Sequence, residues 1–278
     1  MLLGLGSPGL LQGIADDAQD VSCGGDDLTD RANRVAIVTG AARGIGRASA
    51  LRLAKSGHAV AVVDLLLREA EQTAADIRSL GVEALVIEAD VTSLTVAEQS
   101  VAHIVDRLGR VDVLVNNAGR TMSKGLLEIT EAEWNATIDV NLKSFFCWCR
   151  AAAPKMLAQG GGRIVNISSL NAITGGVTRA VSKFAYSAAK AGVLGMTKSL
   201  AKELAPTVAV NAILPGIIRT DINATQVAAR EAELVGSILM GRLGAVDDIA
   251  SLVNYLAAEP NMFMTGQHLV VDGGQWIT

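Results

Sequence analysis

Residues 35–56 read VAIVTGAARGIGRASALRLAKS, and this stretch decides the fold. It begins with a short β-branched run at 35–39, which is typical of a buried strand. A turn with three glycines follows at 40–46, and residues 47–56 have the apolar spacing of a helix. Glycine lets the backbone approach a pyrophosphate closely, and the N–H groups at the start of the helix meet its charge. Strand, turn and helix in this order predict a dinucleotide-binding unit.

The rest of the chain repeats this alternation of strand and helix. Six further apolar runs, separated by longer helical patterns, lie at residues 59–64, 84–88, 111–115, 163–168, 208–213 and 268–271. Continuous apolar strands are expected in a parallel sheet that helices cover on both faces. We therefore predict one α/β domain over residues 33–278, a Rossmann fold with a doubly wound, seven-stranded parallel sheet. In such a sheet, ligands bind at the carboxyl ends of the strands.

Composition argues against several classes of partner. Half of the 278 residues are hydrophobic and 19% are charged, with a formal net charge of -4. The basic residues are scattered, so neither nucleic acid nor an anionic membrane surface is an expected partner. No apolar run reaches the length of a membrane span, and the three cysteines do not suggest a disulfide framework. No metal site is predicted. These features favour a cytoplasmic protein with a small-molecule partner.

Residues 1–32 form a separate segment, which is rich in Gly, Asp and Ser and has no sustained apolar period. Its start is not basic, so it fits neither a secretory signal nor a transit peptide. We expect a disordered or loosely attached extension outside the folded domain.

The end of the second predicted strand bears on the choice between NAD and NADP. Asp64 stands there, where a carboxylate can accept hydrogen bonds from the adenosine ribose hydroxyls and repel a 2′-phosphate. Arg43 in the glycine turn points the other way, because an arginine can bind that phosphate, with Arg68 as a helper; Arg43 can equally brace the loop. The balance favours NAD, with NADP as the alternative. Asp90-Val91, after the third strand, is either a contact for the adenine amino group or an ordinary turn.

Tyr186 and Lys190 are four residues apart at the start of a small-residue helical stretch, 186–204. This spacing places the phenol and the ammonium on one face of the helix. A free tyrosine has a pKa near ~10, and a neighbouring positive charge that stabilises the phenolate lowers it. The pair predicts a proton-transferring tyrosine with a lysine partner; an ordinary surface pair is the alternative.

Motifs after the later strands give this pair its context. They are Asn116-Asn117-Ala118-Gly119, Ser168-Ser169, Pro215-Gly216 through Thr220, Thr265-Gly266-Gln267 and Val271-Asp272-Gly273-Gly274. Taken in order, they resemble the motifs of the short-chain dehydrogenase/reductase family over essentially all of residues 34–278. The resemblance implies an NAD(P)-dependent oxidoreductase acting on CH–OH groups, which moves hydride between the nicotinamide and a secondary alcohol or ketone. Within the family, it points to 3-oxoacyl-carrier-protein reductase-like and to polyol or sugar dehydrogenase members.

The resemblance also implies roles for single residues. Ser169 holds the substrate oxygen, Tyr186 transfers the proton, and Lys190 and Asn141 relay that proton to solvent; a helix-kinking asparagine is the alternative for Asn141. Asn116 is implied to line the cofactor groove or to brace the sheet. The residues implied to bind the cofactor are Gly40, Arg43, Gly44, Ile45, Gly46, Asp64, Asp90, Val91, Asn117, Ala118, Gly119, Tyr186, Lys190, Pro215, Gly216, Ile218 and Thr220.

The serine departs from the usual family pattern. The catalytic serine commonly lies closer to the tyrosine, whereas Ser169 precedes Tyr186 by 17 residues. We interpret residues 172–183 as a lengthened connection beside the substrate pocket. Ser168 and Thr174 stay open as alternative hydroxyl donors.

Substrate and assembly are less constrained by the sequence. Residues 221–240 carry apolar side chains at near-helical intervals, which fits a lid over the substrate or the packed face of an ordinary helix. Asp64 favours oxidation of a sugar, polyol or other small alcohol, with 3-oxoacyl-carrier-protein reduction as the alternative. A non-catalytic cofactor-binding sensor or scaffold is the alternative from another class. The resemblance, together with apolar stretches at 145–153 and 186–204, favours a homotetramer.

Overall fold

The computed structural model of this chain describes residues 34–176, 182–220 and 228–277. The predicted extension at 1–32 lies outside the described residues. Seven strands form one parallel sheet in the order β3-β2-β1-β4-β5-β6-β7, so the predicted doubly wound sheet is confirmed. The strands are β1 (Val35–Thr39), β2 (Ala59–Asp64), β3 (Ala84–Glu88), β4 (Val113–Asn116), β5 (Gly162–Ile167), β6 (Val208–Pro215) and β7 (His268–Val271).

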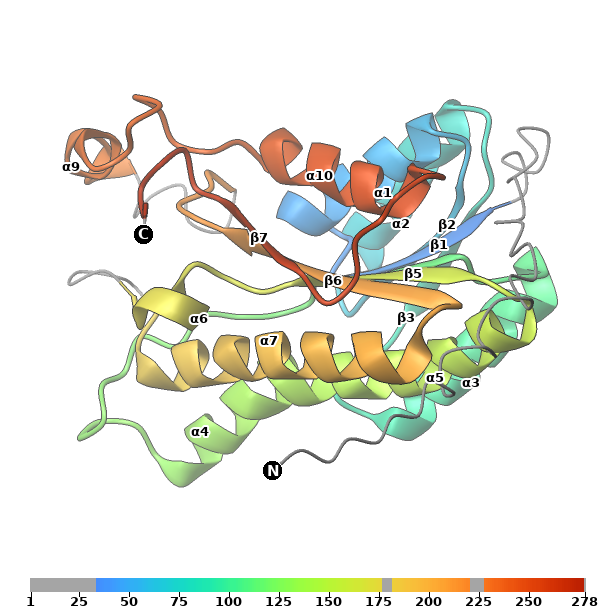
Figure 1. Cartoon of the computed structure of the whole chain (residues 1–278), viewed down its shortest axis with the longest axis horizontal. Coiled ribbons are helices and arrows are strands. Elements are labelled where there is room, and N and C mark those ends of the chain that lie inside the picture. Colours follow the sequence, from blue (N-terminus) through green and yellow to red (C-terminus); the bar gives the residue numbers. More distant parts are fainter. Residues whose placement is uncertain (1–33, 177–181, 221–227, 278) are drawn as a thin grey trace, which may run out of the picture.

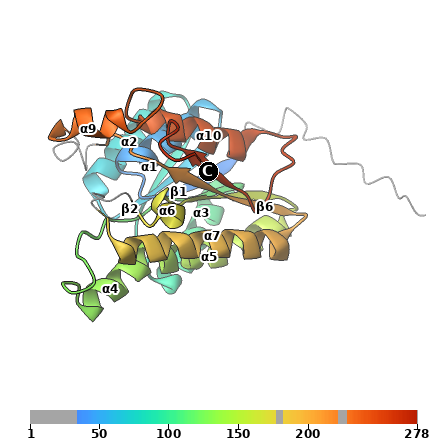
Figure 2. The same cartoon turned by 60° about the vertical axis from the view of Figure 1, so that its left-hand side comes forward.

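Helices cover both faces of the sheet (Figure 1). One face carries α1, α2 and α10 and the other α3, α5 and α7; Figure 2 shows the same three layers after rotation. The shorter helices α4, α6 and α9 lie towards the end at which the strands finish. The bounds are α1 (Gly44–Lys55), α2 (Leu67–Ser79), α3 (Leu94–Leu108), α4 (Glu131–Ile138), α5 (Ser144–Ala158), α6 (Asn171–Thr174), α7 (Phe184–Leu204), α9 (Glu231–Gly236) and α10 (Val246–Ala258).

Two apolar clusters fill the space between the sheet and its helices. Side chains alternate along β1: Ala36 and Val38 join the cluster with α1 and α10, whereas Val35 and Ile37 join the cluster with α3 and α5. All four side chains are almost completely buried. Because both faces of the strand are covered, its sequence shows no polar alternation, which is the pattern expected of a parallel sheet.

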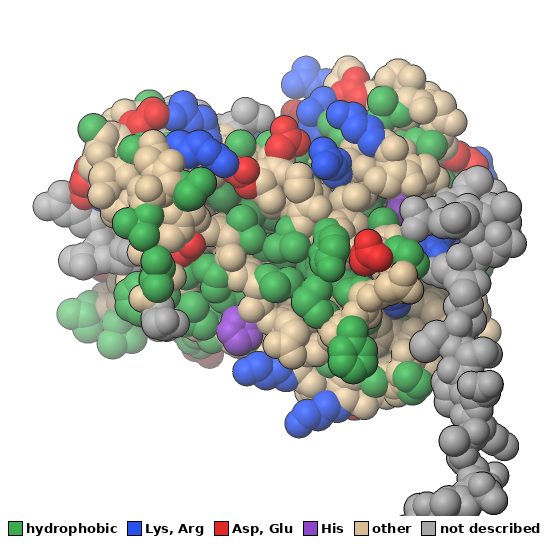
Figure 3. Space-filling view, turned by 45° about the horizontal axis from the view of Figure 1, so that its top comes forward, with side chains coloured by type: hydrophobic (Ala, Val, Ile, Leu, Met, Phe, Trp, Pro, Cys, Tyr) green, Lys and Arg blue, Asp and Glu red, His purple; other side chains and the backbone are tan. Residues whose placement is uncertain are grey.

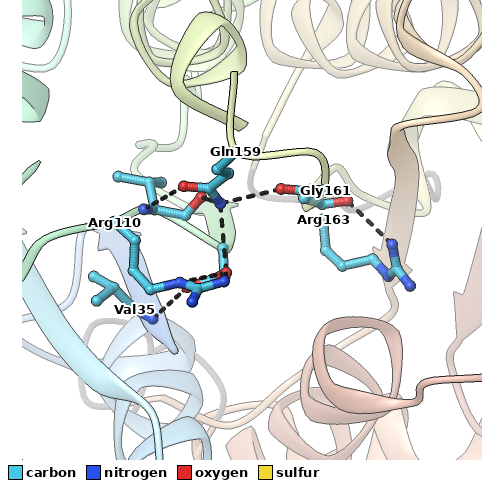
Figure 4. Close-up of polar contacts among 8 residues, drawn as sticks. Val35, Arg110, Gln159, Gly161 and Arg163 are labelled. Carbon is cyan, nitrogen blue, oxygen red and sulfur yellow. Dashed lines mark hydrogen bonds and ion pairs between the residues drawn. The ribbon is translucent and has the colours of Figure 1, made fainter. Parts of the chain in front are cut away.

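The fourth strand begins later than predicted. The sequence predicts a strand over 111–115, but β4 begins at Val113. Gln159 is the cause, because its side-chain amide accepts the N–H of Val111 and donates to the carbonyl of the same residue. Next to it, the Asp112 carboxylate accepts the N–H of Val35 at 2.8 Å. Side-chain bonds therefore take the place of strand pairing at Val111 (Figure 4), whereas the backbone of Asp112 still bonds to the carbonyl of Val35 and to the N–H of Arg163.

The guanidinium of Arg110 completes this group of side chains. It donates to both carboxylate oxygens of Asp112 over 2.7 to 3.0 Å. The amide of Gln159 also reaches the carbonyl of Gly161 at 3.1 Å. We call Arg110, Asp112 and Gln159 the amino-end cluster. It ties the starts of β1 and β4 to the end of α5 (Figure 4), and so lies at the amino ends of these strands.

Apolar side chains gather on the face that carries α10 and β7 (Figure 3). On this face Tyr255 is 47% exposed and Val270 is 40% exposed. Residues 145–153, which the sequence suggests as an apolar face beyond the core, are mostly buried against the sheet, although Phe146 is 48% exposed. None of the described helices combines the length and the apolar character needed to cross a bilayer.

Candidate active site

A cavity of about 610 Å³ opens at the carboxyl ends of the strands. Ligand sites are expected at this edge of a doubly wound sheet. The structure brings most of the predicted residues together here; Gly46 and Asp90 are the predicted cofactor residues outside the wall. The predicted residues in the wall are Gly40, Arg43, Gly44, Ile45, Asp64, Val91, Asn117, Ala118, Gly119, Asn141, Ser169, Tyr186, Lys190, Pro215, Gly216, Ile218 and Thr220.

Gly46 lies behind the cavity wall, where it allows the start of α1 to pack closely against the backbone of Gly40. A Cβ at this position would lie 2.0 Å from the carbonyl oxygen of Gly40, so the backbone would have to move. Gly40 has a φ of +64°, and a Cβ there would lie 2.9 Å from the Cα of Ala118. The two glycines therefore let α1 start close to the ends of β1 and β4.

The start of α1 faces the cavity with its N–H groups uncapped. Arg43 at the N-cap makes no side-chain cap, and the first turn holds no acidic residue. Two helices are capped by the chain itself, since Ser93 caps α3 and Thr130 with Glu133 forms a capping box on α4. The helices α2, α7 and α9 also begin without a side-chain cap, so what sets α1 apart is the glycine turn that leads into it at the cavity wall. N–H groups at a helix start attract anions. This uncapped start, reached past glycines, fits the pyrophosphate of a dinucleotide.

Asp64 at the end of β2 is tied to the glycine turn. Its Oδ2 accepts the N–H of Ala42 at 2.9 Å, and its Oδ1 accepts the N–H of Leu66 at 3.0 Å. Each oxygen keeps acceptor capacity for a ribose hydroxyl. Beside it in the wall, the Arg43 guanidinium has no hydrogen bond or ion pair within the described part of the chain. Arg68 lies outside the wall, with a side chain that is 92% exposed.

Three asparagine and aspartate side chains near the groove make hydrogen bonds that fix a turn, the sheet or the glycine turn. Asp90 Oδ1 accepts the N–H and the hydroxyl of the residue two positions on, which is the turn that the sequence offers as an alternative. Asn116 is buried and donates to Asn166 Oδ1 at 2.9 Å, so it braces the sheet, and its expected place in the groove is wrong. Asn117 lines the cavity while its amide donates to Gly40 O at 3.1 Å.

Tyr186 and Lys190 lie on one side of α7, as their spacing predicts. The Lys190 Nζ is 5.9 Å from the centroid of the Tyr186 ring and 4.6 Å from that of Phe145. It donates a hydrogen bond to the carbonyl of Ile167 at 2.8 Å, and the side chain is almost fully buried. Burial disfavours the charged ammonium and lowers the pKa of Lys190 to about 7.

The pKa of Tyr186 moves in the direction opposite to the prediction. The sequence suggests that Lys190 lowers it, whereas burial of the phenol raises the pKa of Tyr186, and a hydrogen bond with the Ser169 side chain opposes the rise. A buried phenolate loses the stabilisation that water gives it. Lys190 replaces little of that stabilisation, because burial also disfavours the charged form of the lysine.

Ser168 and Ser169, which follow β5, have different partners. Ser168 is buried and donates to the carbonyl of Lys190 at 2.8 Å. The Ser169 oxygen accepts the N–H of Asn171 at 3.2 Å in the cavity wall, which leaves its own proton for another acceptor. Thr174 donates to a backbone carbonyl of its own helix, away from the wall. These contacts favour Ser169 as the donor to a substrate oxygen.

Asn141 occupies a π-helical turn, Asp139–Lys143, between α4 and α5. This turn is the helix irregularity that the kinking alternative predicts. The buried amide donates to the carbonyls of Thr137 and Arg120 at 3.0 and 2.9 Å. Its Oδ1 and the Lys190 Nζ would lie 2.7 and 3.6 Å from a Cβ on Gly119. Both polar groups therefore flank the same small space at the cavity.

The sequence and the fold of this chain are similar to those of known proteins. Residues 34–231 match the family model described as short chain dehydrogenase. The chain belongs to the short-chain dehydrogenase family. The matched residues run from β1 into α9 and contain the glycine turn, Ser169, Tyr186 and Lys190.

Members of the short-chain dehydrogenase family match nearly the whole chain. The 3-oxoacyl-[acyl-carrier-protein] reductase FabG of Staphylococcus aureus is 39% identical over 244 residues, which cover 87% of this chain and 98% of the relative. The crystal structure of a short-chain type dehydrogenase/reductase from Mycobacterium marinum has a TM-score of 0.83 at 33% identity and covers 90% and 98% of the two chains. Acetoin dehydrogenase from Salmonella typhimurium has a TM-score of 0.78 at 39% identity and covers 87% and 95%.

Sequence reasoning missed several polar residues in the wall of this short-chain dehydrogenase, among them Arg120, Arg230 and Gln275. Arg120 and Gln275 directly follow recognised motifs, and that adjacency was the available signal. The Oε1 of Gln275 is buried and has no hydrogen-bond partner among the described residues. Arg230 precedes α9 and pairs with Glu233 at 3.0 Å.

The predicted lid segment is described in part. Leu234 of α9 lies in the cavity wall, which fits the lid interpretation, whereas Ile238 is buried against Leu243, which fits ordinary packing. Ile222 and Val227 lie outside the described residues, as does the middle of the connection at 172–183.

Proposed function

We propose that this protein interconverts a ketone and a secondary alcohol by hydride transfer with a nicotinamide dinucleotide. One observation carries the proposal: Ser169, Tyr186 and Lys190 share the wall of the cavity whose far end is the uncapped start of α1. The N–H groups at that helix start would hold the pyrophosphate of a dinucleotide, and Ser169, Tyr186 and Lys190 would border its nicotinamide.

Each proposed role follows from the chemistry of one group. Ser169 donates a hydrogen bond to the substrate oxygen, and Tyr186 takes the hydroxyl proton in oxidation or returns it in reduction. Lys190 and Asn141 relay that proton towards solvent, and Lys190 also holds the nicotinamide ribose. The bound nicotinamide supplies the hydride donor or acceptor. A high intrinsic tyrosine pKa suits the reducing direction, because the phenol then carries the proton that the forming alkoxide needs.

For the cofactor we propose NAD ahead of NADP. The support is Asp64, whose carboxylate lines the cavity and would repel a 2′-phosphate. Arg43 supports the alternative, since its guanidinium is unpaired in the same part of the wall. Kinetics with both cofactors separate the two.

For the substrate we propose a small alcohol, polyol or sugar, which the likeness to an acetoin dehydrogenase supports. Reduction of a 3-oxoacyl-carrier-protein thioester is the second candidate, and the relative of that name supports it. Assays with a small-alcohol panel and with a 3-oxoacyl thioester distinguish the two.

We further propose that the chain assembles as a homotetramer. The apolar side chains over α10 and β7 support burial against another subunit (Figure 3). Sedimentation velocity at several concentrations tests the assembly, and a single monomeric species throughout contradicts it.

The decisive experiment for the reaction is Tyr186→Phe, which removes the proton carrier and keeps the ring. We expect turnover to fall on the order of 100- to 10,000-fold while cofactor binding persists. The chain has a second tyrosine, Tyr255 on α10, so Tyr255→Phe is the matched control and should retain activity. Turnover of Tyr186→Phe close to wild type would reject the role. Cofactor binding by the wild type without turnover of any substrate would favour a sensor or scaffold instead.

A further inference from the structure

Arg120 lies in the cavity wall next to the proposed catalytic residues, and its guanidinium meets no partner in the part of the chain that the structure describes. It directly follows Gly119, whose Cα is flanked by Asn141 and Lys190. The side chain is exposed, and within the described residues the guanidinium makes neither a hydrogen bond nor an ion pair. An arginine of this kind offers five N–H donors in a planar fork that matches an oxyanion.

The backbone of Arg120 is fixed by a catalytic side chain. The Arg120 N–H donates to Asn141 Oδ1 at 3.2 Å, and Asn141 Nδ2 donates back to the Arg120 carbonyl at 2.9 Å. Both peptide groups on this residue are therefore held by one buried amide. The guanidinium projects from a point with defined position relative to the reacting centre, which limits the entropy lost when it binds a ligand.

Charges in the wall also favour an anion at this end. Among the described residues, Asp64 is the acidic residue in the wall, and it stands at the end of β2. Because β1 separates β2 from β4, two strand spacings or about 10 Å lie between those strand ends. The other arginine on the substrate side, Arg230, has its charge offset by Glu233. Ser169, Tyr186 and Lys190 mark the end of the cavity where the reaction is proposed to occur. At this end Arg120 carries a positive charge that no acidic residue of the described wall offsets.

We propose that Arg120 binds an oxyanion carried by the substrate close to its reacting carbon. The substrate class is then a hydroxy acid with its oxo acid, or a phosphorylated ketone with its alcohol, since carboxylate and phosphate present the same paired oxygens. This inference rests on the proposed oxidoreductase function and names the substrate that the function takes.

The test compares pairs of ketones in which one member carries an anionic group and the other does not. For the carboxylate, 3-oxobutanoate is compared with its ethyl ester; for the phosphate, hydroxyacetone phosphate is compared with hydroxyacetone. One pair will contain a charged ketone that the wild type turns over. For that ketone, Arg120→Gln should lower kcat/KM by about 10- to 100-fold, mainly by raising KM. The neutral member should change by less than about threefold. Arg120→Lys should restore part of the loss, because it keeps the charge and gives up the fork.

Arg107 on α3 provides the matched control, because Arg107→Gln removes the same charge from an exposed site on a helix that does not border the cavity. Arg107→Gln should leave kcat/KM unchanged for all four ketones. Equal losses for charged and neutral ketones in Arg120→Gln, or a weaker affinity for the cofactor alone, would overturn the substrate role. A fall in kcat for every ketone would place Arg120 among residues that position Asn141, which also overturns it.

A second measurement separates this inference from the proposed function. If no ketone is turned over, the four compounds are titrated calorimetrically into the wild type saturated with oxidised cofactor. Binding of a charged ketone that disappears in Arg120→Gln supports the oxyanion site although the reaction has failed. Absence of charged-ketone binding to the wild type rejects the site.

Discussion

The two ends of the central sheet treat their polar groups in opposite ways. At the amino end, Asp112 accepts hydrogen bonds from Val35, Arg110 and Gln159, so each partner is used within the protein. At the carboxyl end, α1 starts without a cap, and Lys190 is buried with a lowered pKa. At the amino end of the sheet, the polar side chains bond to groups of the protein itself. At the carboxyl end, the N–H groups at the start of α1 are available to a ligand.

Stability and chemistry reside at opposite ends of the sheet in this fold. Polar groups that are paired with one another hold strands in register, whereas groups left unpaired at a cavity are costly until a ligand satisfies them. Substitutions at the amino end should therefore change stability and spare turnover. Substitutions at the carboxyl end should change turnover, and some of them should raise stability.

The largest expected effect separates two adjacent serines at the carboxyl end. Ser169→Ala removes the proposed donor to the substrate oxygen and should lower kcat on the order of 100- to 1000-fold. Ser168→Ala removes the bond to the Lys190 carbonyl and should cost less turnover, with a loss of about 1 kcal/mol in unfolding free energy. Steady-state kinetics and urea denaturation measure both. A larger loss of turnover at Ser168 would reverse the assignment of the two hydroxyls.

The next effect concerns the buried lysine and its dependence on pH. The pKa of Lys190 falls from 10.5 to about 7 on folding, so between these values the unfolded chain binds more protons. The destabilisation is therefore full below about pH 7 and fades as the pH rises towards 10.5. Lys190→Met should be the more stable protein at pH 7, and its advantage should shrink by a few kcal/mol by pH 10.

Guanidinium denaturation at three pH values measures this difference. Lys202→Met, on the exposed side of the same helix, is the control and should keep a constant offset from the wild type. The lost hydrogen bond to Ile167 adds an offset that does not vary with pH. If the difference between wild type and Lys190→Met does not change with pH, burial does not depress the lysine pKa.

The third effect tests the amino end. Asp112→Ala removes the side-chain acceptor of the Val35 N–H and the ion-pair partner at 2.7 Å from the Arg110 guanidinium, and should lower the unfolding free energy by about 2 to 3 kcal/mol. The side chain of Asp112 is 12% exposed, so water can compensate only in part. Turnover at 25 °C should remain within about twofold of the wild type. A large loss of turnover in a folded variant would show that the two ends are coupled.

The smallest effect concerns the choice of cofactor. Wild type should have a higher kcat/KM with NAD than with NADP, and Asp64→Ala should lower that ratio by about tenfold, equivalent to about 1.4 kcal/mol. Arg43→Gln should move the ratio in the other direction. Equal or better use of NADP by the wild type would mean that Arg43 dominates this part of the wall.

Local patterns predicted most of the fold. The apolar runs at β1, β2, β3 and β7 match the observed bounds, because a strand buried on both faces leaves its mark in consecutive residues. The strand at 111–115 was misplaced because the backbone of its first residue, Val111, bonds to Gln159, which lies 48 residues further along the chain. No short window of sequence contains that contact.

The candidate site was predictable where spacing alone fixes geometry. Four residues along a helix bring Tyr186 and Lys190 together whatever surrounds them. The direction of the tyrosine pKa was not predictable, since it depends on burial by distant elements. Likewise, Asn116 and Asn117 are neighbours in sequence but on opposite sides of a strand end, and only the fold shows which one reaches the cavity.

The strand order also has a consequence for synthesis of the chain on the ribosome. β1 lies at the centre of the sheet, between β2 and β4, yet β4 is made more than 70 residues after β1. Until residue 113 has emerged, the apolar β1 presents an open edge that invites pairing with other nascent chains. A chaperone that binds extended apolar segments would protect the growing chain during that interval, and the need for it ends when β4 pairs with β1.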